Sequence, residues 1–434
     1  MNLRLLIYLL VINLIPAHLA RKFQKSLIKK MRDKIYQEDF QGTKNNFKPQ
    51  VLIDITNVSK TDRLTGIQRL VKSILSEFEK ITHKTYDIKL IYELRKNCFC
   101  YFGNSLTKGY GNSANAVVVR KGDIFLGLDL MPASIIRNSI ILLKWKLSGV
   151  AFHFIIYDLL PVNEPRFFNH KTVEFYKRWF RWLAVNATTV ICISKVVECD
   201  FKKYLLKKYD ITNIELPSTT MIIGSDLPVC TSSEKYSENT LQSKAKDIHN
   251  IQFLMVGTIE PRKGYHQTIC AFEILWKKYR SSKTNIKLLI IGSKGWKTEK
   301  LQRKILKIST ETSNLVWYEN ASDEILSQSY RDCSALLASS FAEGYGLPLV
   351  EGANYRVPIF ARDIPIFREI NLPNTQYFSA NTPDELAIEI DKFISATLLM
   401  PKNTASKPLQ IPDIHLWSDS AKNLLDLIHV LNKT

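Results

Sequence analysis

The chain is poor in the patterns that build disulfide or zinc frameworks. Its seven cysteines are scattered over 434 residues, are odd in number and form no Cys-x-x-Cys pair. Cys98 and Cys100 are too isolated to form a zinc site alone. This cysteine usage fits a reduced, cytosolic setting rather than a disulfide framework. No internal repeat stands out, which disfavours a solenoid or propeller.

Acidic residues are also scarce. The chain has 41 Asp and Glu against 60 Lys and Arg, which gives a net charge of +19 and a pI near 9.4. Such a balance indicates an anionic partner: nucleic acid, a membrane surface or a phosphorylated substrate. Aromatic residues are not interleaved with the basic runs, and no nucleic-acid recognition motif appears, but a basic nucleic-acid-binding protein stays an alternative. A hydrophobic content of 45% suits two or three domains with sizeable cores.

The N-terminus lacks an apolar run long enough to span a membrane. The strongly apolar stretch 5–12 is followed by Asn13, Pro16 and His18, which interrupt it. A secretory signal would carry its charge before the apolar run, whereas most of the charge here follows it. We therefore predict that residues 1–48 lie on a membrane surface, the inner face of the cell membrane; the alternative is a helix that packs on the protein's own core. The basic residues of this segment are Arg21, Lys22, Lys25, Lys29, Lys30, Arg32 and Lys34.

A strand, a glycine loop and a helix are predicted in succession within residues 335–354. The apolar run 335–338 is typical of a short buried strand, and Pro348 suits the first turn of a helix. In an open α/β sheet such a corner lies at the carboxyl end of the strands, where ligands bind. The alternative is an ordinary connecting loop with a Glu paired to the helix dipole. The candidate ligand contacts here are Glu343, Gly344, Tyr345, Gly346, Leu347 and Glu351.

A second predicted strand end carries two cations. The apolar run from Phe253 ends at Gly257 and Thr258, and the loop continues as Glu-Pro-Arg-Lys-Gly with Arg262 and Lys263. Opposite a phosphorylated substrate, these two cations would neutralise the negative charge that grows when the bond to a phosphate leaving group breaks. An exposed Arg-Lys pair is more often only solvated. The position of this pair at a strand end is what favours a functional role.

The remaining elements follow from hydrophobic periodicity. We predict a polar loop over 56–65, a helix beginning near Gly66 that carries Arg69, and a helix over 415–432 with an apolar face. Tyr157 and Asp158 follow a buried strand and are candidate site residues, whereas His153 within that strand is better explained as core. The predicted strands are 51–55, one within 117–129, 151–156, 190–193, 221–224, 253–257, 288–291, 335–338 and 357–361.

Two stretches resemble a known family. Glu-Gly-Tyr-Gly-Leu-Pro, with seven residues between Glu343 and Glu351, resembles the C-terminal signature of family 4 glycosyltransferases. The run 62–69 resembles the bacterial mannosyltransferases of O-antigen and capsule assembly. The resemblance implies the α/β fold called GT-B, two doubly wound Rossmann-like domains facing a cleft. The implied domains are 49–228 for the acceptor and 250–434 for the nucleotide sugar, with a linker at 229–249 and a final helix that crosses back.

The resemblance also implies a reaction. It is retaining transfer of a hexose, mannose favoured, from a nucleotide-diphosphate sugar, GDP-mannose favoured, to a saccharide or lipid-linked saccharide in surface polysaccharide synthesis. Glu351 would bind the ribose hydroxyls and Glu343 the donor sugar. The amides of residues 344–346 would hold the sugar or a phosphate.

Two positions depart from the family pattern. Thr258 stands where many relatives have Arg, so Lys263 is preferred to Arg262 as the phosphate contact. Tyr157 stands where many relatives have a His facing the donor sugar, and a phenol cannot act as a base near neutral pH. A non-catalytic transferase-like fold is therefore a second alternative. The chain has no Asp-x-Asp, the sequence that chelates a metal in the other major transferase fold, so we predict catalysis without metal or cofactor.

Overall fold

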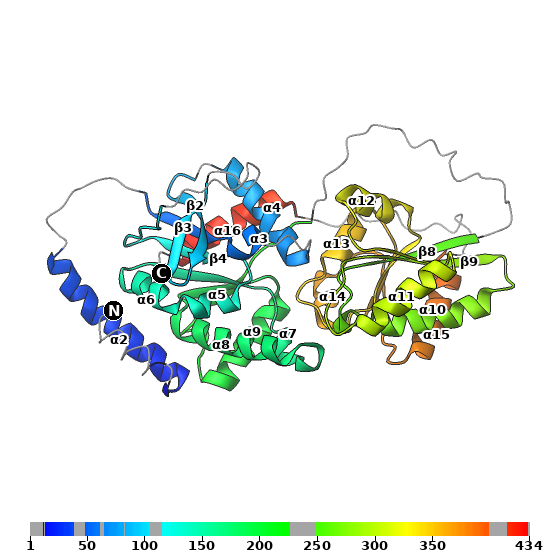
Figure 1. The fold of residues 1–434 in the computed structure, drawn as a ribbon, viewed down its shortest axis with the longest axis horizontal. Helices are drawn as coiled ribbons and strands as arrows, with labels where there is room; N and C mark the ends of the chain where they lie inside the picture. Colours follow the sequence, from blue (N-terminus) through cyan, green and yellow to red (C-terminus); the bar gives the residue numbers. More distant parts are fainter. Residues whose placement is uncertain are drawn as a thin grey trace. The chain divides into compact units, whose positions relative to one another are not determined.

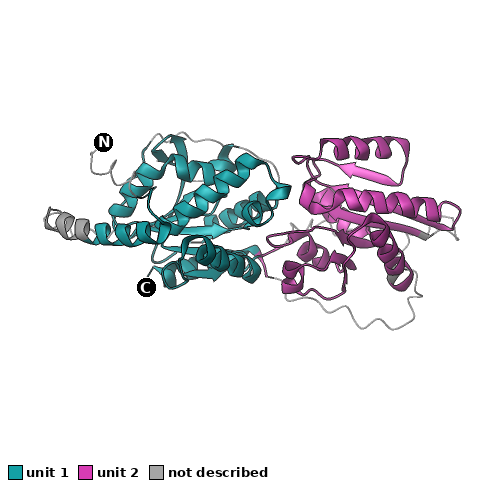
Figure 2. Ribbon diagram, turned by 90° about the horizontal axis from the view of Figure 1, so that it is seen from below, with its two compact units in different colours: residues 1–223, 417–434 teal, residues 224–416 magenta. Residues whose placement is uncertain are grey.

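The computed structural model describes residues 12, 14–38, 48–60, 65–81, 83–103, 115–225, 249–398 and 415–432. They belong to two compact units, residues 1–223 with 417–434 and residues 224–416 (Figures 1 and 2). Residues 229–248 of the predicted linker lie outside the described residues, and residue 249 already begins a strand. Each unit is described by itself below.

The sheet of the first unit is doubly wound. Its strand order is β3-β2-β1-β4-β5-β6-β7, and every neighbouring pair is parallel except β2 with β3. The residues of β1, β4 and β6 are all buried, which is why these strands are almost continuously apolar. The strands are β1 (Gln50–Asp54), β2 (Asp87–Arg95), β3 (Cys98–Tyr101), β4 (Ile124–Gly127), β5 (Ala151–Ile156), β6 (Thr189–Cys192) and β7 (Ser218–Thr220).

Three predictions in this unit need correction. The last strand is β7, which ends at Thr220, and the predicted strand at 221–224 is wrong. The predicted polar loop begins with the short helix α3 (Thr56–Lys60), because Asp54 and Asp129 accept the hydrogen bonds of its first N–H groups. Strands β2 and β3 were not predicted, since β2 has charged residues among its apolar ones and is only partly buried.

The helices of the first unit include one from the end of the chain. The predicted apolar face of α16 is buried at Trp417, Ala421, Leu424, Leu425 and Ile428, and this helix packs against α4. The helices are α2 (Ala17–Glu38), α3, α4 (Gly66–Lys80), α5 (Pro132–Arg137), α6 (Ser139–Leu147), α7 (Leu160–Asn163), α8 (His170–Asn186), α9 (Lys195–Tyr209) and α16 (Trp417–Leu431).

The second unit contains an entirely parallel sheet of order β10-β9-β8-β11-β12-β13. Its core includes the fully buried rings of Phe253, Phe272 and Phe360. Both units therefore have the central strand order of a Rossmann fold. The strands are β8 (His249–Val256), β9 (Thr284–Ile291), β10 (Leu315–Tyr318), β11 (Ala335–Ala338), β12 (Ile359–Arg362) and β13 (Thr375–Phe378). The helices are α10 (Tyr265–Tyr279), α11 (Glu299–Glu311), α12 (Asp323–Asp332), α13 (Leu347–Asn354), α14 (Pro365–Ile370) and α15 (Pro383–Phe393).

Helix α2 packs on α8 of its own unit, which was the alternative to a membrane-surface segment. Arg21, expected among the residues facing lipid, is only 4% exposed. Its guanidinium donates to the carbonyls of Ala184 at 2.9 Å and Ala187 at 3.0 Å at the end of α8, and to the carbonyl of Glu215 at 2.7 Å. Residues 1–11 and 13, with most of the apolar run, lie outside the described residues. Of the helices described, none is both long and apolar enough to cross a membrane.

Removing the Arg21 guanidinium should therefore destabilise the first unit. Arg21→Ala leaves carbonyls at the end of α8 buried without a donor, and it should lower the free energy of unfolding by about 2–4 kcal/mol. Lys22→Ala, at the adjacent exposed position, is the matched control and should change it by less than about 0.5 kcal/mol. Urea unfolding of both variants measures the difference; equal midpoints would show that this contact does not hold α2.

Candidate functional site

The two glycine loops singled out in the sequence meet at the switch point of the second sheet. Strands β8 and β11 are neighbours, but the chain leaves β8 towards β9 and leaves β11 towards β12, on opposite sides. The loops that follow, 257–264 and 339–346, therefore lie together where a doubly wound sheet binds its ligands. A backbone hydrogen bond joins them, from the N–H of Phe341 to the carbonyl of Arg262 at 2.7 Å.

The close approach of these loops depends on glycine. Gly264 has a φ of +74°, and a Cβ there would lie 2.2 Å from the carbonyl oxygen of Ser339. The hydroxyl of Ser339 in turn donates to the carbonyl of Lys263 at 3.1 Å. A side chain at position 264 would thus push the two loops apart and displace Lys263.

Four charged side chains form one cluster at this point. Glu343 accepts from Lys263 at 2.5 Å and from Arg262 at 2.5 Å, and the hydroxyl of Ser340 donates to it at 2.7 Å. The Nε of Arg262 lies 2.9 Å from a carboxylate oxygen of Glu260. The side chains are 8% exposed for Glu260, 9% for Glu343, 13% for Lys263 and 15% for Arg262, so these ion pairs are largely shielded from water.

The pairing fixes the charge state of Glu343. Burial alone would raise its pKa, but the charges of Arg262 and Lys263, with the hydrogen bonds from Lys263 and Ser340, lower the pKa to about 2. Burial raises the pKa of Glu260, although the charges of Arg262 and Lys263 oppose this shift. Glu343 is therefore a carboxylate at neutral pH and a strong hydrogen-bond acceptor.

A hollow that is open to solvent lies beside the cluster. Lys263 and Glu343 line it together with Ser340 and Gly346, and the ends of β8 and β11 close its floor. The hollow is thus lined by a cation, a carboxylate and a residue of the glycine loop, and Arg262 pairs with that carboxylate. That combination suits a ligand with both phosphate and hydroxyl groups.

The other predicted residues of this unit belong to the same two loops and to helix α13. Leu347 begins α13, and Gly344 and Tyr345 precede it in the loop, while Gly257 and Thr258 directly follow β8. Glu351 is the fifth residue of α13. Its side chain is buried and accepts a hydrogen bond from the hydroxyl of Tyr330 at 2.8 Å.

The predicted residues of the first unit form a separate group. Gly66 begins α4 as predicted, Arg69 lies in its first turns, and residues 61–64 of the family-like run are outside the described residues. The carboxylate of Asp158 accepts from the N–H of Leu160 at 3.0 Å. The ring of Tyr157 is buried, and its hydroxyl donates to the carbonyl of Leu128; its contact with the donor sugar stays a prediction. His153 is buried in β5 as expected.

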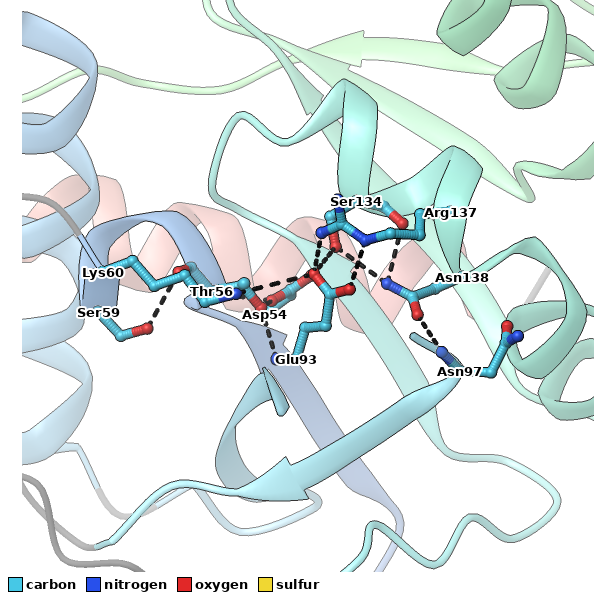
Figure 3. Close-up of polar contacts among 9 residues, drawn as sticks. All are labelled: Asp54, Thr56, Ser59, Lys60, Glu93, Asn97, Ser134, Arg137 and Asn138. Atoms are coloured by element: carbon cyan, nitrogen blue, oxygen red, sulfur yellow. Dashed lines mark hydrogen bonds and ion pairs between the residues drawn. The ribbon is translucent and has the colours of Figure 1, made fainter. Parts of the chain in front are cut away.

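Sequence reasoning missed a polar network at the switch point of the first sheet (Figure 3). The hydroxyl of Thr56 donates to Asp54 at 2.5 Å and accepts from the N–H of Glu93 at 2.7 Å. Glu93 in turn receives hydrogen bonds from Ser134 at 2.9 Å and from the Nε of Arg137 at 2.7 Å. In the sequence, only the position of Asp54 at the end of a predicted strand could have indicated this network. Glu93 gave no such signal, because it lies in a strand that was not predicted.

The pKa values of the two carboxylates in this network are shifted in opposite directions. Burial raises the pKa of Asp54 to about 7, and the hydrogen bonds from Thr56 only partly oppose it. Burial would also raise the pKa of Glu93, but the hydrogen bonds from Arg137, Asn138 and Ser134 lower it to about 2.

Nowhere in the described part of the chain do three or more His, Cys, Asp or Glu side chains form a group that could hold a metal ion.

The raised pKa of Asp54 predicts a pH dependence of stability. The folded state binds this proton more tightly than the unfolded chain, whose pKa is near 3.8. The stabilisation is therefore present at low pH and is lost as pH rises towards about 7, with a slope of up to about 1.4 kcal/mol per pH unit. Asp54→Asn should flatten this window in urea unfolding measured from pH 4.5 to 7.5. Asp87→Asn, at an exposed carboxylate, should keep the wild-type slope; an unchanged slope in Asp54→Asn would contradict the assignment.

Comparison with known proteins finds a family model that matches part of the chain. Residues 237–406 match the family described as "Glycosyl transferases group 1". The chain is 31% identical over 388 residues to the serotype-specific mannosyltransferase WbdA of Escherichia coli. The aligned region covers 88% of this chain and 46% of that protein. The chain thus spans about half the length of the curated relatives that it matches.

Solved structures agree with the fold. The crystal structure of Anabaena Alr3699/HepE in complex with UDP and glucose aligns over 89% of this chain and 97% of that one, with a TM-score of 0.54 and 13% identity. WaaG, a glycosyltransferase involved in lipopolysaccharide biosynthesis, aligns over 88% and 97%, with a TM-score of 0.50 and 15% identity. At this identity the likeness concerns the fold alone, and it confirms the predicted GT-B class.

Proposed function

We propose that this chain, whose residues 237–406 belong to the group 1 glycosyl transferases, moves a hexose from a nucleotide-diphosphate sugar to a saccharide with retention of configuration. The observation that carries the proposal is the pairing of Lys263, Arg262 and Glu343 over a glycine loop at the switch point of the second sheet. The same match to the group 1 family disfavours a nucleic-acid-binding protein.

Each part of the site takes one part of the donor in this proposal. Lys263, with Arg262 behind it, stabilises the diphosphate as negative charge develops on the leaving group. Glu343 accepts hydrogen bonds from the sugar hydroxyls, and the backbone amides of residues 344–346 hold the sugar or a phosphate. Gly257 and Thr258 line the approach to the diphosphate. The two cations supply the charge that a metal ion would otherwise provide, so we expect transfer to continue in excess chelator.

Mannose, from GDP-mannose, is the proposed sugar, because a relative that covers 88% of this chain is named a mannosyltransferase. The first unit would hold the acceptor, a saccharide or lipid-linked saccharide of surface polysaccharide, with Gly66, Arg69 and Asp158 as candidate contacts. A cytoplasmic protein peripheral on the membrane is the proposed setting. Support for it comes from the exposed side of α2, where Leu19 and Phe23 lie among lysines.

Lys263→Ala tests the proposed role of the cluster. A cation matched to the leaving group acts mainly in the transition state, so turnover should fall by about 100-fold or more while the fold is kept. Lys294→Ala, which removes an equal charge from an exposed ion pair with Glu319 in the same unit, should keep most of the activity. Release of nucleoside diphosphate during transfer is the measurement. Wild-type turnover in Lys263→Ala would remove this residue from the site.

Glu351→Gln tests the proposed ribose contact. The substitution keeps the size of the side chain and its bond from Tyr330, but a neutral amide accepts hydrogen bonds less strongly than a carboxylate. We expect the affinity for GDP to fall by about tenfold in titration calorimetry, with no comparable loss of affinity for inorganic pyrophosphate, which has no ribose. Equal losses for both ligands would instead indicate a general disturbance of α13.

A further inference from the structure

The two cations of the site are already paired with carboxylates of the protein. Glu343 binds both Lys263 and Arg262, and Glu260 binds Arg262 from the other side. Two cationic side chains are therefore matched by two carboxyl groups within one cluster. Glu260 lies in the same loop as the cations, next to Pro261, and it was not among the residues predicted from the sequence.

A diphosphate that enters this cluster meets cations whose charge is already compensated. The carboxylates lie within 3 Å of the cations, so an anion that reaches Lys263 also approaches Glu343. In a partly shielded site, two like charges a few ångströms apart repel each other by several times more than in water. The ligand therefore has to share the cations with two internal anions or displace one of them.

We propose that Glu260 and Glu343 act as internal competitors of the diphosphate, which hold Arg262 and Lys263 in place and keep the affinity for the released nucleoside diphosphate low. The proposal rests on the function proposed above. Glu343 faces the hollow and also serves the sugar, whereas Glu260 does not line the hollow and acts only through Arg262. Glu260 is thus a positioning residue, and its charge sets how strongly Arg262 attracts a second anion.

This arrangement has a consequence for turnover. A site with two unpaired buried cations would bind the product diphosphate tightly, and release would then limit the rate. With the carboxylates present, each cation returns to a protein partner when the product leaves. The cluster therefore lowers the cost of product release, and it also keeps the cations from being left buried and unpaired in the empty site.

The test is the affinity of the full chain for inorganic pyrophosphate and for GDP, measured by titration calorimetry. Glu260→Gln keeps the size of the side chain and removes one competing charge. It should bind both ligands about tenfold more tightly than wild type and should show correspondingly stronger inhibition by GDP in the transfer assay. Glu343→Gln should also bind pyrophosphate more tightly, although its transfer activity falls because the sugar loses a contact. Glu311→Gln, which removes an exposed carboxylate from α11, is the matched control and should leave both affinities at the wild-type value.

The Lys263→Ala and Gln variants together distinguish failure of the competitor proposal from failure of the proposed diphosphate site. If Lys263→Ala weakens pyrophosphate binding while neither Gln variant strengthens it, the cluster is the diphosphate site but the carboxylates are not competitors, and the present proposal is overturned. If Lys263→Ala binds pyrophosphate as wild type does, the diphosphate site itself is wrongly placed. Circular dichroism of each variant establishes that it is folded; should Glu260→Gln fail to fold, the Glu343→Gln affinity decides.

Discussion

The site of the second unit depends on the contact between the loops that follow β8 and β11. The strand order brings the two loops together, and the hydrogen bond from Phe341 to the carbonyl of Arg262 fixes their register. Only glycine at position 264 allows this approach, because any Cβ would collide with the carbonyl of Ser339. The position of Lys263 beside Glu343 follows from these backbone contacts rather than from attraction between the charges alone.

The charge cluster shows why position matters more than net charge. The chain carries +19 overall, but a solvated cation on a protein surface has little influence on other charges. Arg262 and Lys263 differ because they are shielded and aimed at one carboxylate. In the proposed reaction they need little reorganisation when charge moves from the glycosidic bond to the diphosphate, which is the usual origin of electrostatic catalysis.

The parts predictable from sequence were those with continuous local signals. Residues 335–338 and 151–156 are buried strands because both faces of a parallel sheet are covered, and their apolar runs showed it. Glu343 and Lys263 were predicted as site residues because they lie in loops at strand ends and because these loops resemble the family's sequence motifs. The pairing between them could not be read from the sequence, because the residues are far apart in the chain and the sheet order brings them together. Glu260, Glu93 and the burial of Arg21 were missed for the same reason: each depends on a partner from another element.

The central claim is retaining transfer of a sugar from a nucleotide donor, and the stereochemistry of the product tests it most directly. The chain would be incubated with GDP-mannose, in which the sugar is α-linked, and a mannose-containing acceptor. The anomeric proton of the new residue would then be read by nuclear magnetic resonance alongside the GDP released. The account predicts an α-linked mannose formed in step with GDP. A β-linked product would contradict the retaining mechanism, and absence of transfer from every nucleotide sugar tested would contradict the proposed activity itself.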